Sequence, residues 1–461
     1  MITLRPIKAG TPMGLPRIYD TSVFDTSKPV ESWWEASAPP FRKNFARLDR
    51  SVTCDVAIIG AGFTGLNAAL ALARDHGLDV RVLEAGHIGW GASGRNGGFC
   101  ANPGTKLSWT EVASRYGRDE AIKLNTAQEE AIAHVRSVLD RYGIDAETHS
   151  DRGELCLAHT REEAEVLPDE AKVIEDLFGR KPTLYRKEEL RQLGADSPDF
   201  HGGMLLPWGF ALHPLRYLRG LADAAADAGV ALHPHSEVTG VALNDGSHRL
   251  RTANGEIWAK HLIVATNGYT AETIPPWIAG RLLPAMSSIL VTRPLTDDEQ
   301  AAQGWTCDLM AYDTRSLLHY FRKLPDGRFL FGGRGGVSGK PASRAKFLKR
   351  LRQQFDEMFP ALRDVETTHQ WSGHVCITRK RAPFVGTING HETAWAGLAF
   401  HGSGVAMGSW TGRTLAGLVA GTETTADLPA VMRDAPPKFL FPALRPLYLS
   451  AVYALYQRHD G

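Results

Sequence analysis

The first clear alternation of apolar and polar positions runs from residue 55 to residue 84. Val56–Ile59 is a short apolar run, mostly β-branched, and predicts a buried parallel strand. A helical pattern follows, with an apolar side made of Leu66, Ala69, Leu70 and Ala73. Val80–Leu83 is a second short apolar run and predicts the next strand. The order strand, helix, strand predicts a βαβ unit with parallel strands.

Helical and strand patterns alternate along the rest of the chain. The helical patterns lie at 119–141, 161–177, after His213-Pro214 with Gly229 as a cap, and at 345–358. The strand patterns lie at Leu262–Ala265 and within 317–336, and residues 394–421 read as strand, glycine-rich turn and helix. This order predicts an α/β fold with a discontinuous first domain. The chain has one βαβ unit at the start, mixed strand and helix patterns in the middle, and a second glycine-rich helix start near the end.

Composition narrows the classes of function. The chain has 461 residues, of which 43% are apolar and 22% charged, and its formal net charge is +1. These values are typical of a globular protein and give no sign of binding to nucleic acid or to an anionic membrane. No run approaches the roughly 18 to 20 apolar residues of a membrane span, and residues 1–14 lack the apolar core of a signal peptide. We therefore expect a cytoplasmic location.

The cysteines are scattered and form no C-x-x-C pair, so we expect neither a metal site nor a disulfide framework. They are Cys54, Cys100, Cys156, Cys307 and Cys376.

The glycines inside the βαβ unit indicate its chemistry. Gly60, Gly62 and Gly65 have the spacing G-x-G-x-x-G between the predicted strand and helix. Such glycines allow a tight turn, a close approach of a pyrophosphate to the backbone, and close packing of helix on strand. Glu84 ends the second strand, where a carboxylate can accept hydrogen bonds from ribose hydroxyls. The unit therefore predicts a bound dinucleotide.

A second glycine-rich helix start, at His401–Gly404, favours a large cofactor with two ring systems. Gly402 and Gly404 place backbone N–H groups and a positive helix end where the N1–C2=O region of a flavin gains negative charge on reduction. Between the two motifs, residues 89–99 are rich in small residues that let the backbone pass against a flat ring, with Arg95 and Asn96 for polar contacts.

Together these motifs resemble the D-amino-acid oxidase superfamily of flavoproteins. The residues that carry the resemblance are GAGFTG at 60–65, Glu84, GASGRNGG at 91–98 and AGLAFHGSGVAMG at 396–408. Within the superfamily, WWEAS at 33–37 and YFRKLPDGRFLFGG at 320–333 resemble the subgroup of bacterial γ-glutamylputrescine oxidases.

The resemblance implies an FAD-binding, Rossmann-like domain of the GR2 type and a substrate domain of α+β character built on a mixed sheet. We expect the FAD domain to comprise residues 51–150, 205–285 and 365–435, and the substrate domain 151–204 and 286–364. Residues 1–50 would form an N-terminal extension and 436–461 a C-terminal tail. The residues expected to hold FAD are Gly60, Gly62, Phe63, Thr64, Gly65, Glu84, Ala85, Ala92, Ser93, Arg95, Asn96, Gly97, Gly98, Val238, Thr266, Gly268, Gly402, Gly404 and Val405.

The chain departs from the family pattern at two places. Relatives commonly carry Gly-His-Gly near the flavin, whereas this chain has Gly402-Ser403-Gly404 with the imidazole of His401 one residue earlier. His401 and Ser403 are therefore the candidates for groups next to the flavin. Some relatives attach FAD to a cysteine ahead of the final strand, and Cys376 lies in that region, but its spacing to Pro383 does not match. We expect non-covalent FAD.

The implied reaction is oxidation of a C–N bond to an imine, which water hydrolyses to carbonyl and amine, with dioxygen or another acceptor taking the electrons. We favour a γ-glutamyl amine as substrate, and no obligate protein partner is evident. For its carboxylate, a bidentate arginine is the natural ligand. The candidate substrate-binding residues are Arg322, Arg334, Arg381, Tyr320 and Trp371.

Other functions remain open. A sarcosine, N-methyl or D-amino acid oxidase or dehydrogenase would use the same chemistry. A flavin monooxygenase or reductase fed by NAD(P)H would need a second dinucleotide site, for which GRGGVSG at 333–339 is the candidate. A flavin- or nucleotide-bound sensor without enzymatic activity is a third class.

Overall fold

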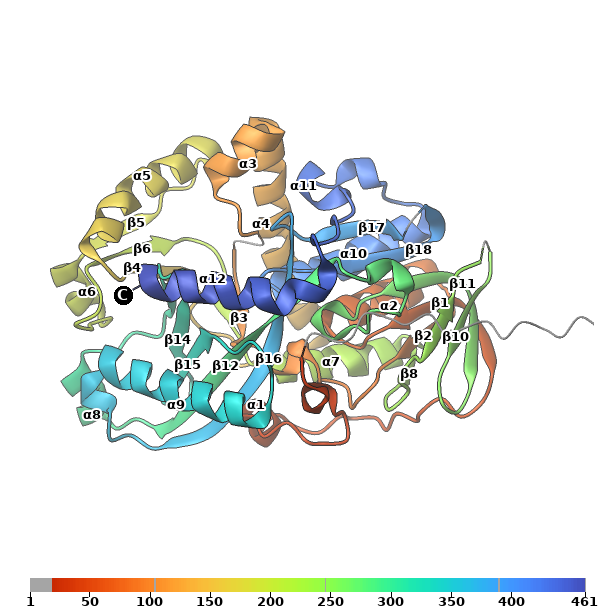
Figure 1. Ribbon diagram of the computed structural model, residues 1–461, viewed down its shortest axis with the longest axis horizontal. Coiled ribbons are helices and arrows are strands. Elements are labelled where there is room, and N and C mark those ends of the chain that lie inside the picture. The colour runs from red at the N-terminus through yellow and green to blue at the C-terminus, as the bar shows by residue number, and fades with distance from the viewer. Residues whose placement is uncertain (1–18, 103–104, 245, 389, 461) are drawn as a thin grey trace, which may run out of the picture.

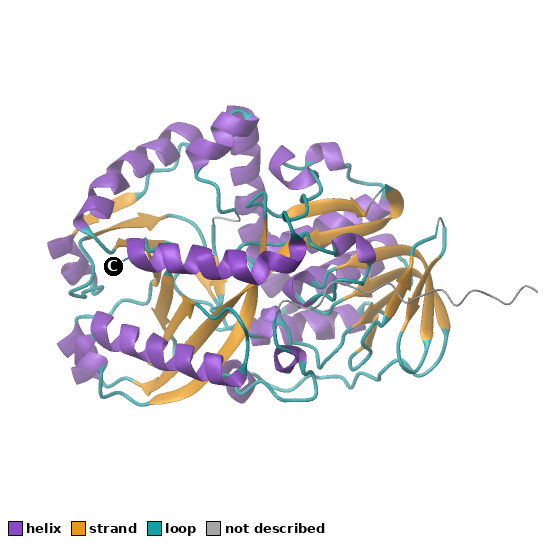
Figure 2. Ribbon diagram, viewed as in Figure 1, coloured by secondary structure: helices purple, strands orange, loops and turns teal. Residues whose placement is uncertain are grey.

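The computed structural model describes residues 19–102, 105–244, 246–388 and 390–460 (Figure 1). The described residues form two large β-sheets with helices packed around them, and Figure 2 shows the strands of both sheets in orange.

The first sheet carries the βαβ unit. Its order is β17–β18–β11–β1–β2–β8, and the neighbours from β18 to β8 are all parallel. β9 and β10 extend it through antiparallel pairing of β10 with β11. The bounds are β1 Val52–Ile59, β2 Val80–Leu83, β8 Ala231–His233, β9 Gly240–Ala242, β10 His248–Arg251, β11 Glu256–Val264, β17 Phe384–Ile388 and β18 His391–Leu398.

Both faces of β1 are buried, which explains its continuous apolar run. Val56 and Ile58 belong to the core on the helical side, whereas Ala57 and Ile59 belong to a separate cluster on the opposite face. Because successive side chains of a strand point to opposite faces, a strand covered on both sides needs apolar residues at every position.

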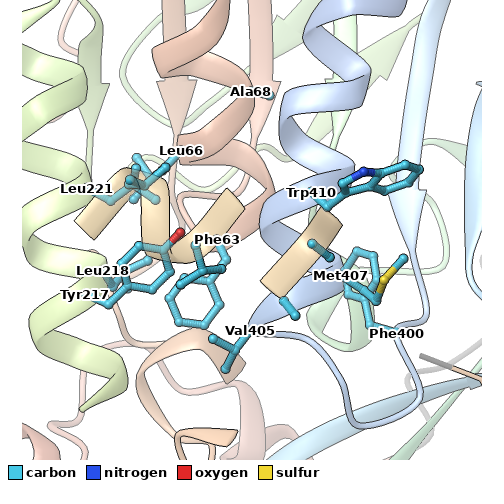
Figure 3. Packing of buried hydrophobic residues seen from close by; sticks show 14 of the residues in the cluster. Phe63, Leu66, Ala68, Tyr217, Leu218, Leu221, Phe400, Val405, Met407 and Trp410 are labelled. Atoms are coloured by element: carbon cyan, nitrogen blue, oxygen red, sulfur yellow. The ribbon is translucent and has the colours of Figure 1, made fainter. Parts of the chain in front are cut away.

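Three helices pack on the first face, and they are α2 Phe63–His76, α7 Pro214–Asp227 and α10 Ala406–Ala420. A fourth, α4 Arg118–Tyr142, packs on α7 and α10. Figure 3 shows α2 between α7 and α10, with the ring of Phe63 stacked on that of Tyr217 at 5.1 Å between centroids. α2 and α10 approach closely because Gly412 has no side chain: a Cβ there would lie 2.3 Å from the Thr64 carbonyl oxygen.

The second sheet is mixed and has the order β16–β12–β15–β14–β13–β4–β6–β5. All its neighbours are antiparallel except β13 and β4. The bounds are β4 Glu154–Ala158, β5 Thr183–Arg186, β6 Gly202–Leu206, β12 Leu282–Pro294, β13 Met310–Asp313, β14 His319–Lys323, β15 Arg328–Arg334 and β16 Thr367–Thr378.

The remaining elements are peripheral or short. A two-stranded sheet joins β3 Phe99–Cys100 to β7 Phe210–Ala211. α12 crosses the front of the molecule in Figure 1, and the buried Arg445 anchors it to Glu272 at 2.9 Å. The other helices are α1 Trp33–Ser37, α3 Trp109–Tyr116, α5 Arg161–Phe178, α6 Lys187–Leu193, α8 Asp297–Gln303, α9 Pro341–Met358, α11 Ala430–Arg433 and α12 Arg445–His459.

The structure confirms the α/β class, the βαβ unit and the mixed second sheet. The helices predicted with residue bounds begin and end within two residues of those bounds, except α9, which begins four residues earlier than expected. β16 pairs with β12 in the second sheet. The division into domains stays a prediction.

Candidate active site

A cavity of about 380 Å³ lies where the two sheets meet. The first sheet contributes the carboxyl ends of β1, β2 and β11, and the turn before α10 closes that side. The second sheet contributes residues of β4, β12, β13, β14, β15 and β16. The carboxyl edge of a parallel sheet is the usual place for a ligand in open α/β folds.

The turn after β1 is shaped for close contact. Gly60 has φ +106°, and a Cβ there would lie 2.8 Å from the Ala265 carbonyl oxygen. α2 begins with no capping side chain from its own N-cap residue, Gly62. The Phe63 N–H donates to Ser93 Oγ at 3.0 Å. The helix N-terminus thus keeps N–H groups and a positive dipole end for an anion in the cavity.

Glu84 lies where the second strand ends, as predicted. Its carboxylate accepts from the N–H of Ala61 at 2.9 Å and of Gly86 at 3.1 Å. Burial raises the pKa of this carboxyl, and the two backbone donors oppose that shift. The carboxylate is therefore held rigidly beside the turn that begins α2.

The segment after β2 is held against the cavity by its own polar side chains. Arg95 donates to the carbonyl oxygens of Trp90 at 2.6 Å and of Ser372 at 3.1 Å. Asn96 donates to the Ser93 carbonyl oxygen at 2.9 Å and accepts from the Gly98 N–H at 2.8 Å. These bonds fix the short 3-10 turn Ala92–Gly94 against the cavity wall.

The turn before α10 brings His401 and Ser403 to the cavity. Ser403 Oγ donates to the Ala101 carbonyl oxygen at 2.5 Å. His401 Nε2 lies 3.3 Å from Thr378 Oγ1. Burial lowers the pKa of His401 to about 3, so its imidazole is neutral.

These residues fit an FAD, because several groups are explained by a ligand better than by the protein. Gly404 lines the cavity, yet a Cβ there would meet no described protein atom within 4 Å. Asn102 also lines the cavity, and its Oδ1 is buried without a partner in the described part of the chain. Buried polar atoms normally have hydrogen-bond partners, so such atoms indicate a missing group.

Most of the expected cofactor residues meet in this cavity. They are Gly60, Gly62, Phe63, Thr64, Glu84, Ala85, Ala92, Ser93, Arg95, Asn96, Gly97, Val238, Thr266, Gly402, Gly404 and Val405. Three glycines serve packing instead. A Cβ at Gly65 would lie 1.9 Å from the Gly60 carbonyl oxygen, and a Cβ at Gly98 would lie 2.1 Å from the Leu212 carbonyl oxygen. A Cβ at Gly268 would lie 3.3 Å from His374 Cβ. Asn267, between the two predicted positions, lines the cavity in place of Gly268.

Of the expected substrate residues, Arg334 and Tyr320 line the cavity. The Tyr320 hydroxyl lies 2.9 Å from Ser287 Oγ. Arg334 Nη2 lies 3.5 Å from the place of a Cβ on Gly402. Its guanidinium has no hydrogen bond or ion pair with another described residue, and burial lowers its pKa.

Arg322, Arg381 and Trp371 do not line the cavity, contrary to the sequence-based expectation. Arg322 is fully buried, and its guanidinium donates to the carbonyl oxygens of Gly97 and Leu212 at 3.0 and 2.8 Å. Arg381 is partly exposed and pairs with Glu111. Trp371 lies in the core, where its Nε1–H donates to the Arg95 carbonyl oxygen at 2.8 Å. All three brace cavity-forming segments from behind.

Sequence reasoning missed other groups in the cavity wall. The charged ones are Lys106, Glu154 and Glu237, and the polar or aromatic ones include Asn102, Tyr269, Ser287, Tyr312 and His374. None of them belongs to a recognisable motif. Only their convergence in space singles them out.

Two further expectations concern alternatives to a simple non-covalent flavin site. Cys376 lines the cavity, and burial raises the pKa of its thiol, which disfavours the nucleophilic thiolate. The segment 333–339 follows β15, which pairs antiparallel with both β12 and β14. A second dinucleotide site of βαβ type would need parallel strands, so this pairing argues against it.

Within the described residues, the helices include none long and apolar enough to cross a membrane. Nor do the described side chains bring three or more His, Cys, Asp or Glu together as a possible metal site.

Comparison with known proteins gives concordant matches. The model of the family described as DAO, FAD dependent oxidoreductase, matches residues 55–418. A Rhizobium meliloti protein named "probable oxidoreductase OrdL" is 34% identical, with 87% of this chain and 90% of that protein aligned. The γ-glutamylputrescine oxidoreductase of Escherichia coli is 32% identical over 91% of this chain and 94% of its own. The crystal structure of glycine oxidase from Geobacillus kaustophilus has a TM-score of 0.67 at 21% identity, covering 81% of this chain and 96% of that one.

Proposed function

We propose that this chain, which belongs to the DAO family of FAD-dependent oxidoreductases, oxidises the C–N bond of an amine that carries a carboxylate, with a γ-glutamyl amine as the favoured substrate. Relatives of this chain include proteins named glycine oxidase and sarcosine oxidase subunit beta, and the relative from Escherichia coli is named for γ-glutamylputrescine. The proposal concerns which amine this chain takes.

The observation that carries the proposal is Arg334. A guanidinium in a cavity, without a protein partner among the described residues, is costly unless a ligand pairs with it. Its planar fork matches a carboxylate with two parallel hydrogen bonds. Arg334 is adjacent to Gly402, in the turn expected to meet the flavin, so a carboxylate bound there belongs to a molecule that also reaches the reacting centre.

Bound FAD supplies the acceptor for the hydride equivalent that leaves carbon. The residues of this chain position the substrate and control charge around it. Arg334 would hold the carboxylate, while the Tyr320 hydroxyl, oriented by Ser287, would offer a neutral hydrogen bond. His401 is neutral and contributes no positive charge, so an amine can enter the cavity without repulsion from that imidazole.

An amine panel tests the proposal in the holoprotein. Each amine is added anaerobically, and bleaching of the flavin absorbance measures substrate oxidation whatever the natural electron acceptor is. We expect γ-glutamylputrescine to have a kcat/KM at least about 30-fold above that of putrescine, since a buried charge-assisted pair is worth about 2 kcal/mol. Subsequent admission of air with a peroxide assay distinguishes oxidase from dehydrogenase.

Other results would overturn the choice of substrate. Faster bleaching by sarcosine, glycine or a D-amino acid than by any γ-glutamyl amine would place the chain with its more distant relatives. Flavin reduction by NADPH or NADH, without any amine, would support the monooxygenase or reductase alternative. The cytoplasmic location and the non-covalent state of FAD stay predictions.

A further inference from the structure

Three ionisable side chains share the part of the cavity wall that the cofactor motifs do not supply. Arg334 comes from the end of β15, Glu154 from the start of β4, and Lys106 from the segment between β3 and α3. None of the three charged groups has a hydrogen bond or ion pair within the described residues, although Glu154 is only 7% exposed. This part of the cavity wall thus contains two basic side chains and one carboxyl group, none of which is paired with another described residue.

The backbone around these groups is firmly held. Glu154 is paired on both sides, with Met310 of β13 and Leu206 of β6. The N–H of Lys106 donates to the Arg381 carbonyl oxygen at 2.9 Å. The charged side chains therefore extend from fixed positions, as a built recognition site requires.

We propose that Glu154 and Lys106 join Arg334 in recognising a zwitterionic α-amino-acid head on the substrate, with the two cations on the α-carboxylate and Glu154 on the α-ammonium. This proposal rests on the proposed function and names the substrate class more closely. It adds a requirement for the α-ammonium that a single arginine would not impose.

The charges of the site support this assignment. Repulsion from Arg334, followed by burial, lowers the pKa of Lys106 to about 7. Burial raises the pKa of Glu154 to about 8, against the opposing charge of Lys106. Without a ligand, Glu154 is thus mostly protonated and neutral near pH 7, and Lys106 is about half protonated. A zwitterion brings a counter-charge for each, and so favours the charged form of each.

Two substrate analogues separate the contributions. Glutarylputrescine lacks only the α-ammonium of γ-glutamylputrescine, and 4-aminobutanoylputrescine lacks only its α-carboxylate. We expect Glu154→Gln, which keeps the shape but removes the charge, to lower the preference for γ-glutamyl over glutaryl substrate by at least about tenfold in kcat/KM. Lys106→Met should lower the preference for γ-glutamyl over 4-aminobutanoyl substrate instead. Glu175→Gln on the exposed side of α5 is the matched control and should change neither ratio.

A merely structural role for Glu154 would alter all substrates alike. If Glu154→Gln lowers kcat/KM for γ-glutamyl and glutaryl substrates by the same factor, Glu154 does not read the ammonium and the proposal is wrong. Glu154→Asp retains the charge and should restore part of the preference. Flavin content is measured for every variant, so that loss of cofactor is not mistaken for loss of recognition.

A binding measurement keeps this test separate from the proposed function. L-Glutamate, glutarate and 4-aminobutyrate are titrated into the holoprotein while the flavin absorbance is followed. Tighter binding of L-glutamate than of the other two, lost selectively in Glu154→Gln and Lys106→Met, supports the site even if no γ-glutamyl amine is oxidised. Equal binding of all three by the unaltered protein would refute it.

Discussion

Substitution of Gly404 is expected to separate the effect on folding stability from the effect on FAD affinity. This glycine lines the cavity just before α10, has no φ in the left-handed region, and its Cβ would meet no described protein atom within 4 Å. Neither backbone conformation nor protein packing therefore explains the absence of a side chain. A close-lying flavin ring would explain it, because even one methyl group would occupy the space of the ring.

The expected effects follow from this geometry. A Gly→Ala change at a compatible φ alters folding stability by about 0 to 1 kcal/mol, usually upward, because the unfolded chain loses freedom. We therefore expect Gly404→Ala apoprotein to unfold at or slightly above the temperature of the unaltered apoprotein. FAD affinity should fall by about tenfold in Gly404→Ala and about a hundredfold or more in Gly404→Val, or roughly 1.4 and 2.7 kcal/mol.

Gly65→Ala is the contrasting variant. Its Cβ would lie 1.9 Å from the Gly60 carbonyl oxygen, so backbone must move, and we expect a loss of roughly 3 kcal/mol or more of folding stability. The assay is calorimetry of each apoprotein, followed by titration with FAD and detection by quenching of flavin fluorescence. Gly404→Val with unchanged FAD affinity would refute the placement of the flavin. A destabilised Gly404→Ala apoprotein would refute the claim that the space is empty of protein.

Three other outcomes are expected. Gly62→Val should abolish FAD binding, because the valine side chain would occupy the space through which the pyrophosphate approaches the backbone. The valine Cβ would also lie 2.8 Å from Ser93 Oγ. A full flavin spectrum of this variant would contradict the prediction. Acid precipitation should release intact FAD, and Cys376→Ala should keep its flavin, whereas a flavin peptide containing Cys376 in a digest would show a covalent link. Arg334→Ala should lower kcat/KM for the best carboxylated amine by about 30-fold, or about 2 kcal/mol. Arg381→Ala should leave this kcat/KM nearly unchanged. Equal losses in the two variants would show that the carboxylate is bound elsewhere.

The sequence alone predicted which of the expected cofactor residues would lie together, because their placement depends on local order. Gly60, Gly62 and Glu84 lie at the ends of strands that are neighbours in a βαβ unit, so spacing along the chain implies their place in space. The same holds for Gly402 and Gly404 at the start of α10. Motif and position coincide in both cases, and the cavity contains all five residues.

The substrate half depends on which distant segments lie against one another, and only the tertiary structure decided that. The two-residue period of β14 places Tyr320 and Arg322 on one face, yet Tyr320 lines the cavity while Arg322 lies behind the segment that contains Gly97. Lys106 and Glu154 follow no periodic pattern that indicates a site. They converge because the tertiary structure brings β4 and the segment after β3 to the same cavity. Alternation along a strand tells which face a side chain takes, but long-range packing determines what that face meets.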